Sequence, residues 1–179
     1  MRPERHRTGW RATGRLALLL LLAAPAFSGC AGYRLGTMLP PSLRTVYVPT
    51  VVNATEEPLL EGEVTRALLA RIRTDGSLRA VGEETADAVL RVTLRRFQMD
   101  PIAFERGQAA RASAYRLTLT ASLVFADART GDVVAAAPSA TGETTVETGG
   151  DLSSAKRAGI PTLAEDLARD IVRRVVEAW

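Results

Sequence analysis

One stretch of strict alternation, residues 115–125, constrains the fold more than any other feature of this chain. Apolar side chains occupy every second position, and polar side chains lie between them. The apolar members are Tyr115, Leu117, Leu119, Ala121, Leu123 and Phe125, and the polar members are Arg116, Thr118, Thr120 and Ser122. Successive side chains of a strand point to opposite faces. The stretch therefore predicts a strand of an antiparallel sheet that is covered on one face only.

Three further stretches have the composition of strands. Residues 44–48 alternate, are rich in β-branched side chains and stop at a proline, and residues 87–99 alternate over a longer run. In the longer run Ala88, Leu90, Val92 and Leu94 point one way, and Arg91, Thr93 and Arg95 point the other. Residues 127–132 are typical of a hairpin turn. Residues 133–148 then predict a returning strand, interrupted at Pro138 as on a sheet edge.

Two segments repeat apolar residues every three or four positions, which predicts amphipathic helices. The first follows Pro58 and ends at Asp75-Gly76. Its apolar positions are Leu60, Val64, Ala67, Leu68 and Ile72; those of the second are Leu163, Leu167, Ile171, Val175 and Ala178. A capping-box spacing from Thr162 to Glu165 predicts that the second helix starts there, with an upstream start and a kink at Pro161 as the alternative.

These elements define a fold class. Two helices have two apolar stripes to bury, and the sheet offers one apolar face. The sequence predicts an α+β, two-layer sandwich with two helices packed on one face of a four-stranded, mostly antiparallel sheet, in the order β-α-β-β-β-α. Residues 78–81 are expected to be a short strand or extended link, and residues 101–112 a loop. The other face of the sheet is left for solvent or for a partner.

The N-terminal segment has the layout of a secretory signal peptide. Basic residues precede an apolar run at residues 16–27, and two small residues then precede Cys30. The run is shorter than the roughly 20 residues of a spanning helix. We expect residues 1–29 to be cleaved, residues 30–42 to be a lipidated tether, and residues 43–179 to form one domain. The alternatives are an uncleaved membrane anchor and an ordinary buried cysteine.

Charge and composition exclude several functions. Without the five arginines and one glutamate of residues 1–29, the 23 basic and 20 acidic residues become 18 and 19, so net charge gives no support for nucleic-acid binding. The only histidine is His6 and the only cysteine is Cys30. The remaining chain cannot build a Ser-His-Asp or Cys-His site or a soft metal site. We expect no catalytic residues, metal or cofactor; a hydrolase would have to rely on Asp87, Asp127 and Asp132.

Several motifs together resemble the lipopolysaccharide-assembly lipoprotein family LptE. The start at Cys30 to Leu35 looks like the lipidated start of that family, and small residues before the lone cysteine resemble a lipobox, although Phe27 stands where leucine is usual. Further matches run in order over most of the chain after residue 29. They are Val46-Tyr47-Val48-Pro49, Asn53-Ala54-Thr55, Asp75-Gly76-Ser77-Leu78, Ala86-Asp87-Ala88-Val89-Leu90, Tyr115-Arg116-Leu117-Thr118 and Asp127-Ala128-Arg129-Thr130-Gly131.

The resemblance implies a function. Members of that family are lipid-anchored at the periplasmic face of the outer membrane and act as plug and assembly partner of the large β-barrel LptD, where they contact lipopolysaccharide. Their fold, two helices on a four-stranded sheet, agrees with the one predicted above. The alternative is a different outer-membrane lipoprotein that docks on a secretion or cell-wall complex.

Two sets of residues are candidates for binding. Arg91, Arg95 and Arg116 are expected on the uncovered face, where guanidinium groups suit the phosphates of lipopolysaccharide. The alternative is that they only solubilise an exposed strand. Phe104 and Arg106, in the predicted loop, are candidates for contact with the barrel, or simply part of a flexible hairpin tip. Cys30 is the predicted site of lipid attachment.

Overall fold

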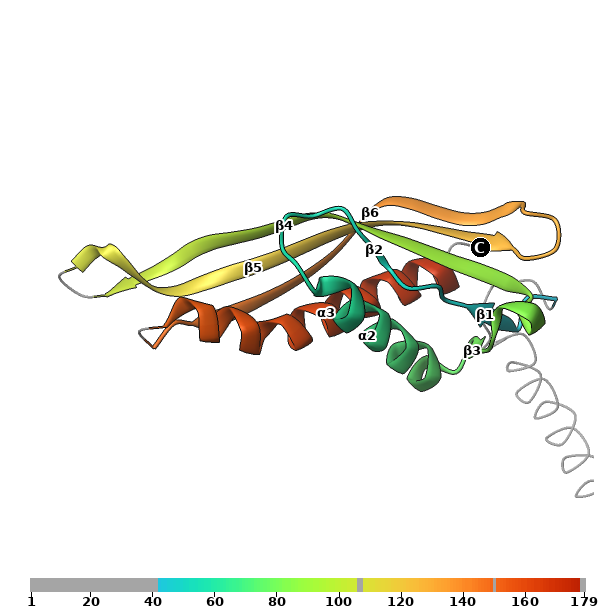
Figure 1. Cartoon of the computed structure of the whole chain (residues 1–179), viewed down its shortest axis with the longest axis horizontal. Helices are drawn as coiled ribbons and strands as arrows, with labels where there is room; N and C mark the ends of the chain where they lie inside the picture. The colour runs from blue at the N-terminus through green and yellow to red at the C-terminus, as the bar shows by residue number, and fades with distance from the viewer. Residues whose placement is uncertain (1–41, 106–107, 150, 178–179) are drawn as a thin grey trace, which may run out of the picture. The chain divides into compact units, whose positions relative to one another are not determined.

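The computed structural model describes residues 42–105, 108–149 and 151–177. In chain order the elements are β1 (Thr45–Tyr47), β2 (Val52–Asn53), α2 (Leu60–Asp75), β3 (Arg79–Ala80), a 3-10 turn (Glu83–Thr85), β4 (Ala88–Glu105), β5 (Gln108–Asp127), β6 (Val133–Glu147) and α3 (Leu152–Glu177). The four predicted strands and both helices are therefore confirmed (Figure 1). β3 confirms the short strand expected within residues 78–81, and with the additional β2 the sheet has six strands rather than the predicted four.

The strands form one mixed sheet in the order β3-β1-β4-β5-β6, and β2 also pairs with β4. β5 pairs antiparallel with both β4 and β6. β1 pairs in parallel with β3 and β4, and β2 pairs in parallel with β4. β5 has 20 residues, which is about 65 Å at 3.3 Å per residue. Most strands have five or six residues. The sheet is therefore a long antiparallel ribbon with short parallel strands beside β4.

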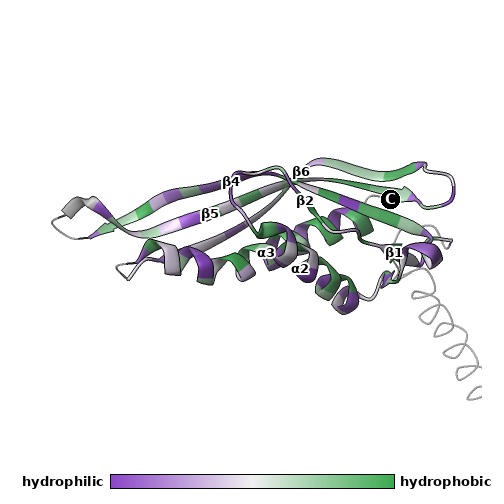
Figure 2. Ribbon diagram, viewed as in Figure 1, coloured by the Kyte–Doolittle hydropathy of each residue, from purple (hydrophilic) through white to green (hydrophobic). Residues whose placement is uncertain are grey.

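Both helices lie on the same face of the sheet (Figure 1). Side chains from β4, β5, α2 and α3 form one buried cluster that includes Leu90, Leu119, Phe125, Leu68 and Leu167. Figure 2 shows how hydrophobic and hydrophilic positions alternate along the long strands and both helices. The predicted two-layer α+β sandwich, covered on one face, is confirmed.

A β-bulge at Arg95 changes the facing of side chains along β4. Leu94 pairs with Ala121, but Thr120 pairs with Arg96, so one extra residue is inserted. Phe97 and Met99 thereby pack against the core together with Leu94. The prediction of an unbroken alternation over residues 87–99 is wrong beyond Leu94, because the bulge shifts the inward positions from even to odd numbers.

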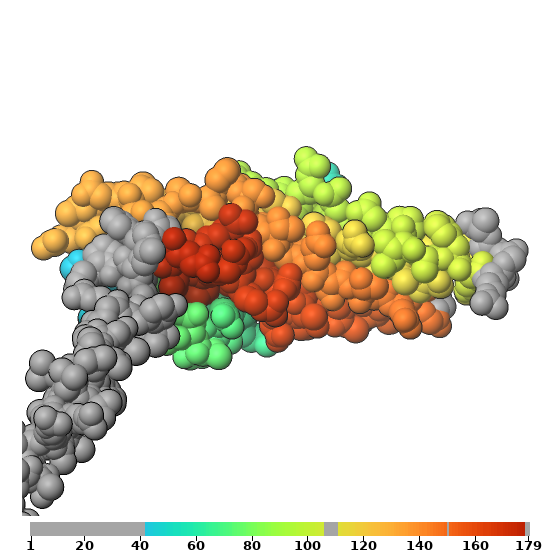
Figure 3. Space-filling model, turned by 180° about the vertical axis from the view of Figure 1, so that it is seen from behind, coloured from blue at the N-terminus to red at the C-terminus, as the bar shows by residue number. Residues whose placement is uncertain are grey.

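The predicted loop at residues 101–112 is wrong. β4 continues to Glu105 and β5 begins at Gln108. Proline has no backbone N–H to donate to the neighbouring strand. Pro101 is tolerated because the pairing shifts register between Pro101 and Ala103, where a hydrogen bond from every residue is not required. The end of the β4–β5 hairpin extends beyond the start of α3, as Figures 1 and 3 show. We call residues 100–105 and 108–114 the hairpin arm.

Helix α3 begins ten residues before the predicted start at Thr162. The Asp151 carboxylate accepts hydrogen bonds from the backbone N–H groups of Ser153 (3.1 Å) and Ser154 (3.2 Å), as an N-cap does. Pro161 lies inside the helix. The upstream start, which the sequence left open, is therefore the correct one, and the capping-box spacing does not mark an end.

Helix α3 approaches β6 closely where β6 has a glycine. A Cβ atom on Gly142 would lie 2.5 Å from the backbone nitrogen of Leu167 and 2.7 Å from the carbonyl oxygen of Leu163. β6 itself has a bulge at Pro138, since Ala140 pairs with Ala121 and Ala137 with Leu123. The predicted interruption at Pro138 on a sheet edge is thus seen as a bulge.

Candidate functional site

The face of the sheet opposite the helices is polar, and we call it the uncovered face. Its residues follow from the register of β4, β5 and β6. They include Arg91, Thr93, Arg95, Arg96, Gln98 and Asp100 on β4; Arg116, Thr118, Thr120 and Ser122 on β5; and Thr141, Glu143 and Thr145 on β6. Toward the β5–β6 turn the same face continues with apolar Val89, Val124 and Ala136. Hydroxyl, guanidinium and amide groups dominate this surface. It can therefore make hydrogen bonds to a polar partner along much of its length.

The bulge places two adjacent arginines on the uncovered face. The Arg95 Nε donates a hydrogen bond to the Ser122 Oγ at 2.9 Å, and Arg96 lies opposite Thr120. Both side chains are exposed, and within the described ranges neither forms an ion pair with a carboxylate. Arg96 was not among the binding residues predicted from the sequence. Two consecutive arginines inside an alternating strand, followed by the shift from Leu94 to Phe97, were the signal of the bulge.

The three arginines predicted for binding all lie on the uncovered face, but the structure does not gather them into one cluster. Arg91 pairs with Val124, and Arg95 contacts Ser122. Arg116 lies six residues further along β5 from Ser122, which is about 20 Å, and sits opposite Asp100 and Thr145. An extended ligand could reach all three. A single phosphate group could not.

A hollow of about 530 Å³ lies beside the bulge. One wall is the loop of residues 54–57, and the other is formed by Arg95, Arg96 and Phe97. Asn53 builds the loop: its amide nitrogen donates to the Glu57 carbonyl oxygen (2.8 Å), and its side-chain oxygen accepts from the Thr55 N–H (3.1 Å). Lys156 of α3 pairs with the Glu57 carboxylate at 2.8 Å. The loop is therefore held in shape by Asn53 and is joined to α3 by Lys156.

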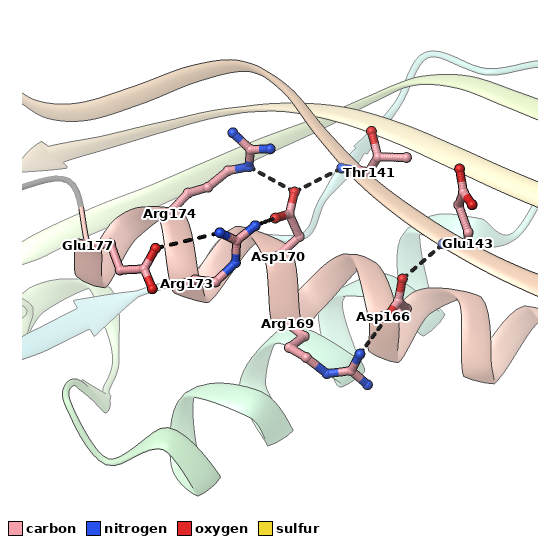
Figure 4. Close-up of polar contacts among 8 residues, drawn as sticks. All are labelled: Thr141, Glu143, Asp166, Arg169, Asp170, Arg173, Arg174 and Glu177. Carbon is pink, nitrogen blue, oxygen red and sulfur yellow. Dashed lines mark hydrogen bonds and ion pairs between the residues drawn. The ribbon is translucent and has the colours of Figure 1, made fainter.

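The free edge of β6 is closed by carboxylates from α3 (Figure 4). The Asp170 carboxylate accepts from the Thr141 N–H at 3.1 Å, and the Asp166 carboxylate from the Glu143 N–H at 3.0 Å. Burial raises the pKa of Asp170, but hydrogen bonds from Arg174, the Thr141 N–H and Arg173 outweigh it and leave the pKa below its ordinary value. These residues protect an edge strand from pairing with another chain.

The side of the molecule seen in Figure 3 is formed largely by α3 and β6. A shallow hollow of about 390 Å³ lies there, lined by Thr141, Asp166, Arg169, Asp170, Arg173 and Arg174. Its arginines are already paired: Arg169 with Asp166, Arg173 with Asp170 and Glu177, and Arg174 with Asp170. The cluster is thus an internal ion network, whereas Arg91, Arg96 and Arg116 of the uncovered face lack such partners within the described ranges.

Two of the three carboxylates considered for a hydrolase, those of Asp87 and Asp127, hold strands and turns together. The Asp87 carboxylate accepts from the Thr45 hydroxyl (2.7 Å), the Thr45 N–H (2.8 Å) and the Arg44 N–H (3.0 Å). The Asp127 carboxylate accepts from the N–H groups of Arg129 and Thr130 in the β5–β6 turn. In the part of the chain that the structure describes, no group of three or more metal-binding side chains could hold an ion.

The remaining predicted sites lie on the hairpin arm and at the N-terminal end. Phe104 is 54% exposed and Ile102 43%, so the arm presents two large apolar side chains. Arg106 and Cys30 lie outside the described residues, as do the predicted signal peptide and nearly all of the tether. Among the helices that are described, none has both the length and the apolar character required to cross a membrane.

The comparisons with solved structures show the fold. A lipoprotein from Nitrosomonas europaea is 15% identical, with a TM-score of 0.51 over 79% of this chain and 90% of that one. A protein from Xanthomonas campestris is 14% identical, with a TM-score of 0.52 over 80% and 92%. A minor lipoprotein from Acinetobacter baumannii is 11% identical, with a TM-score of 0.50 over 74% and 92%. No curated protein matches the chain by sequence.

The family comparison covers most of the chain and nearly all of the described fold. The model of the LptE family, described as lipopolysaccharide-assembly, matches residues 43–175. That range begins just before β1 and ends in the last turn of α3. The motifs of the sequence analysis and the helix-covered sheet lead to the same assignment. This chain belongs to the LptE family of lipopolysaccharide-assembly proteins.

Proposed function

We propose that this protein is a lipoprotein, attached through Cys30 to the periplasmic face of the outer membrane, that binds the β-barrel LptD as its plug and assembly partner. In this role it assists the transport and insertion of lipopolysaccharide. The family assignment supports the class of process. The signal-peptide layout before Cys30 supports the anchor. Two or three acyl chains would give the stable attachment that one chain cannot.

The observation that carries the barrel partnership is the uncovered face. It is long, polar and free of helices, whereas the opposite face of the sheet is buried and the edge of β6 is closed by Asp166 and Asp170. The lumen of a large membrane β-barrel is lined by polar side chains. A long surface of threonine, serine and arginine side chains can match such a lining through direct and water-mediated hydrogen bonds.

The hairpin arm supports a second contact with the barrel. An isolated two-stranded ribbon is only marginally stable in water, and this arm also exposes Ile102 and Phe104. Binding of these two side chains by a partner would remove apolar surface from water and order the arm. We therefore retain Phe104 and the neighbouring Arg106 as contact residues for the barrel.

The proposal also gives the arginines a role toward lipopolysaccharide. Arg91, Arg95 and Arg116 are spaced along the uncovered face, so they suit a long ligand that carries several phosphates rather than a single anion. The competing explanation is that they keep an exposed sheet soluble. Replacement of Arg91 and Arg95 by alanine distinguishes these roles: weaker lipopolysaccharide binding by a folded variant supports contact, and unchanged binding supports solubility alone.

A pull-down from outer membranes tests the partnership. We expect the wild-type chain to retain one large β-barrel protein, identified as LptD by mass spectrometry. Thr118→Trp places a bulky side chain in the middle of the uncovered face and should reduce capture at least tenfold. Thr162→Trp adds the same side chain at an exposed position of α3 and is the matched control. Capture of secretion or cell-wall components by the wild type, without a barrel, would support the alternative docking role instead.

Retention in the envelope tests the anchor in the same preparation. Cys30→Ala removes the only thiol of the chain, so the variant should leave the membrane fraction and appear in the periplasm. A variant that stays membrane-bound in the absence of the barrel would contradict lipid attachment at Cys30.

A further inference from the structure

The hollow beside the bulge of β4 has opposite charges on its two walls. Arg95 and Arg96 lie on one wall, and Glu56 and Glu57 on the other. Its volume of about 530 Å³ falls in the range of small-ligand pockets. Neither the uncovered face as a whole nor the contact with a barrel requires such a hollow, so its chemistry merits a separate explanation.

The charged groups of the hollow are not neutralised by one another. Glu57 pairs with Lys156 of α3 at 2.8 Å. In the described ranges Glu56 and Arg96 form no ion pair, and Arg95 uses only its Nε, toward Ser122. Arg95, Arg96 and Glu56 are therefore all lining residues of one hollow, and no ion pair joins them in the described ranges. A ligand that carries both charges can bridge them.

The types of side chain define the ligand. Guanidinium groups match the geometry of a phosphate, and two of them can hold it together. A carboxylate suits a primary ammonium, which offers three N–H donors. Simple phosphate would be repelled by Glu56, and a simple amine would be repelled by Arg95 and Arg96. A zwitterion that carries both a phosphate and an ammonium group satisfies both walls.

The walls are fixed before any ligand binds. Asn53 and Thr55 hold the loop through hydrogen bonds of 2.8 to 3.1 Å, and Lys156 joins it to α3. On the opposite wall, Ser122 orients Arg95. Little conformational entropy of the loop backbone and of Arg95 then remains to be lost on binding, whereas the exposed side chains of Arg96 and Glu56 become ordered only with the ligand.

We propose that this hollow binds a phosphoethanolamine group, with the phosphate held by Arg95 and Arg96 and the ammonium by Glu56. Such a group occurs in phospholipid head groups and as a substituent on glycolipids. The chemistry that the hollow recognises is the same in both. The site goes beyond the proposed contact with a barrel and does not depend on it.

Isothermal titration of the purified full chain with O-phosphoethanolamine tests the site. We expect the wild type to bind this probe at least tenfold more tightly than inorganic phosphate or ethanolamine. Arg96→Gln should weaken binding of the probe at least tenfold. Glu56→Gln should abolish the preference for phosphoethanolamine over phosphate, which a merely structural role would not do. Arg129→Gln, in the exposed β5–β6 turn, is the matched control and should bind like the wild type.

The source of the group is assigned by competition against the bound probe. Micelles that contain phosphatidylethanolamine should displace it and those with phosphatidylcholine should not, if the source is a phospholipid. Lipopolysaccharide with phosphoethanolamine substituents should displace it, and unsubstituted lipopolysaccharide should not, if the source is a glycolipid. Displacement by neither source overturns the proposal, as does equal affinity of the wild type for phosphate and phosphoethanolamine.

The outcome is independent of the proposed barrel contact. Arg95 belongs both to the hollow and to the arginines proposed to contact lipopolysaccharide, so the titration relies on Arg96 and Glu56, which belong to the hollow alone. Glu56→Gln should still capture the barrel in the pull-down, because the uncovered face is intact. Loss of barrel capture by the wild type would contradict the proposed function and leave the titration unaffected. Thermal unfolding of each variant, monitored by circular dichroism, identifies any loss of binding that comes from misfolding.

Discussion

Individual aspartate side chains join neighbouring helices and strands of this protein through hydrogen bonds. Asp87 joins the start of β4 to β1 by accepting three hydrogen bonds from Arg44 and Thr45. Asp151 caps α3, and Asp170 connects α3 to β6. Hydrogen bonds to the ionised carboxylate favour the charged form. Each of these residues therefore links the stability of the fold to pH.

Asp87 gives a pH dependence with a definite sign. The hydrogen bond from the Thr45 hydroxyl, followed by those from the N–H groups of Thr45 and Arg44, lowers the pKa of Asp87 from its ordinary value of 3.8. The unfolded chain then takes up the proton at a higher pH than the folded chain. The stabilisation by Asp87 is therefore present above about pH 4 and is lost as the pH falls through the folded-state pKa.

We predict that Asp87→Asn lowers the free energy of unfolding at pH 7 and flattens its decrease between pH 5 and pH 2. Urea unfolding at a series of pH values measures both effects. Asp132→Asn is the control, since the Asp132 side chain accepts no hydrogen bond in the described ranges. Equal slopes for Asp87→Asn and the wild type would show that Asp87 has the same pKa in both states.

The facing of residues was predicted correctly along β5, but along β4 only as far as the bulge. The alternation up to Leu94 correctly placed Arg91 and Thr93 opposite the core. Beyond it, the single inserted residue placed Arg95 and Arg96 together and returned Phe97 to the core. The sequence of β4 does signal a break in the alternation at Arg95-Arg96, but the pairing around the bulge depends on the register of the partner strand, which no single strand sequence contains. The hollow was therefore beyond prediction, because it also needs the loop of residues 54–57.

At the scale of elements, the contact between α3 and β6 determines how the layers fit. Asp166 and Asp170 are one helical turn apart, a rise of about 6 Å. The N–H groups of Thr141 and Glu143, two residues apart on a strand, are separated by about 7 Å. The two spacings match. Gly142, which lies between Thr141 and Glu143, has no side chain and lets the backbone of α3 approach β6 closely. Packing and edge protection thus come from the same few residues.

We predict that Gly142→Ala destabilises the fold by about 1 to 3 kcal/mol, the usual range for overpacking. Its Cβ would meet helix backbone at 2.5 and 2.7 Å, which no side-chain rotation relieves. Gly62→Ala, in α2 with nothing within 4 Å of the new Cβ, is the matched control. It should stabilise the fold by up to about 1 kcal/mol. Urea unfolding compares the two, and a neutral Gly142→Ala would show that α3 does not pack on β6 this closely.

The elements that sequence reasoning missed were decided by tertiary contacts. The hairpin arm contains Pro101 and a small-residue segment that favour a loop, yet pairing with the opposite strand extends both strands to Glu105 and Gln108. Helix α3 runs through Pro161 because Asp151 caps an earlier start and Gly159 packs against Val146. Local composition was a correct guide to the type of each long element, and a poor guide to its ends.

At the scale of the whole folded domain, asymmetry is the feature that relates structure to function. One face of the sheet carries both helices and the core, and the other carries arginine, threonine and serine side chains. This division could be predicted from the periodicity of residues 115–125 alone. The family assignment connects it to lipopolysaccharide assembly, and the polar face is the surface that we propose for the barrel partner.

Photocrosslinking in living cells tests this central claim most directly. A photoreactive phenylalanine analogue is placed at Thr118, in the middle of the uncovered face, and at exposed Glu165 on α3 for comparison. We predict that the probe at Thr118 forms a covalent product with one large outer-membrane barrel protein. A product from Glu165 with none from Thr118 would contradict the assignment of the uncovered face as the partner surface.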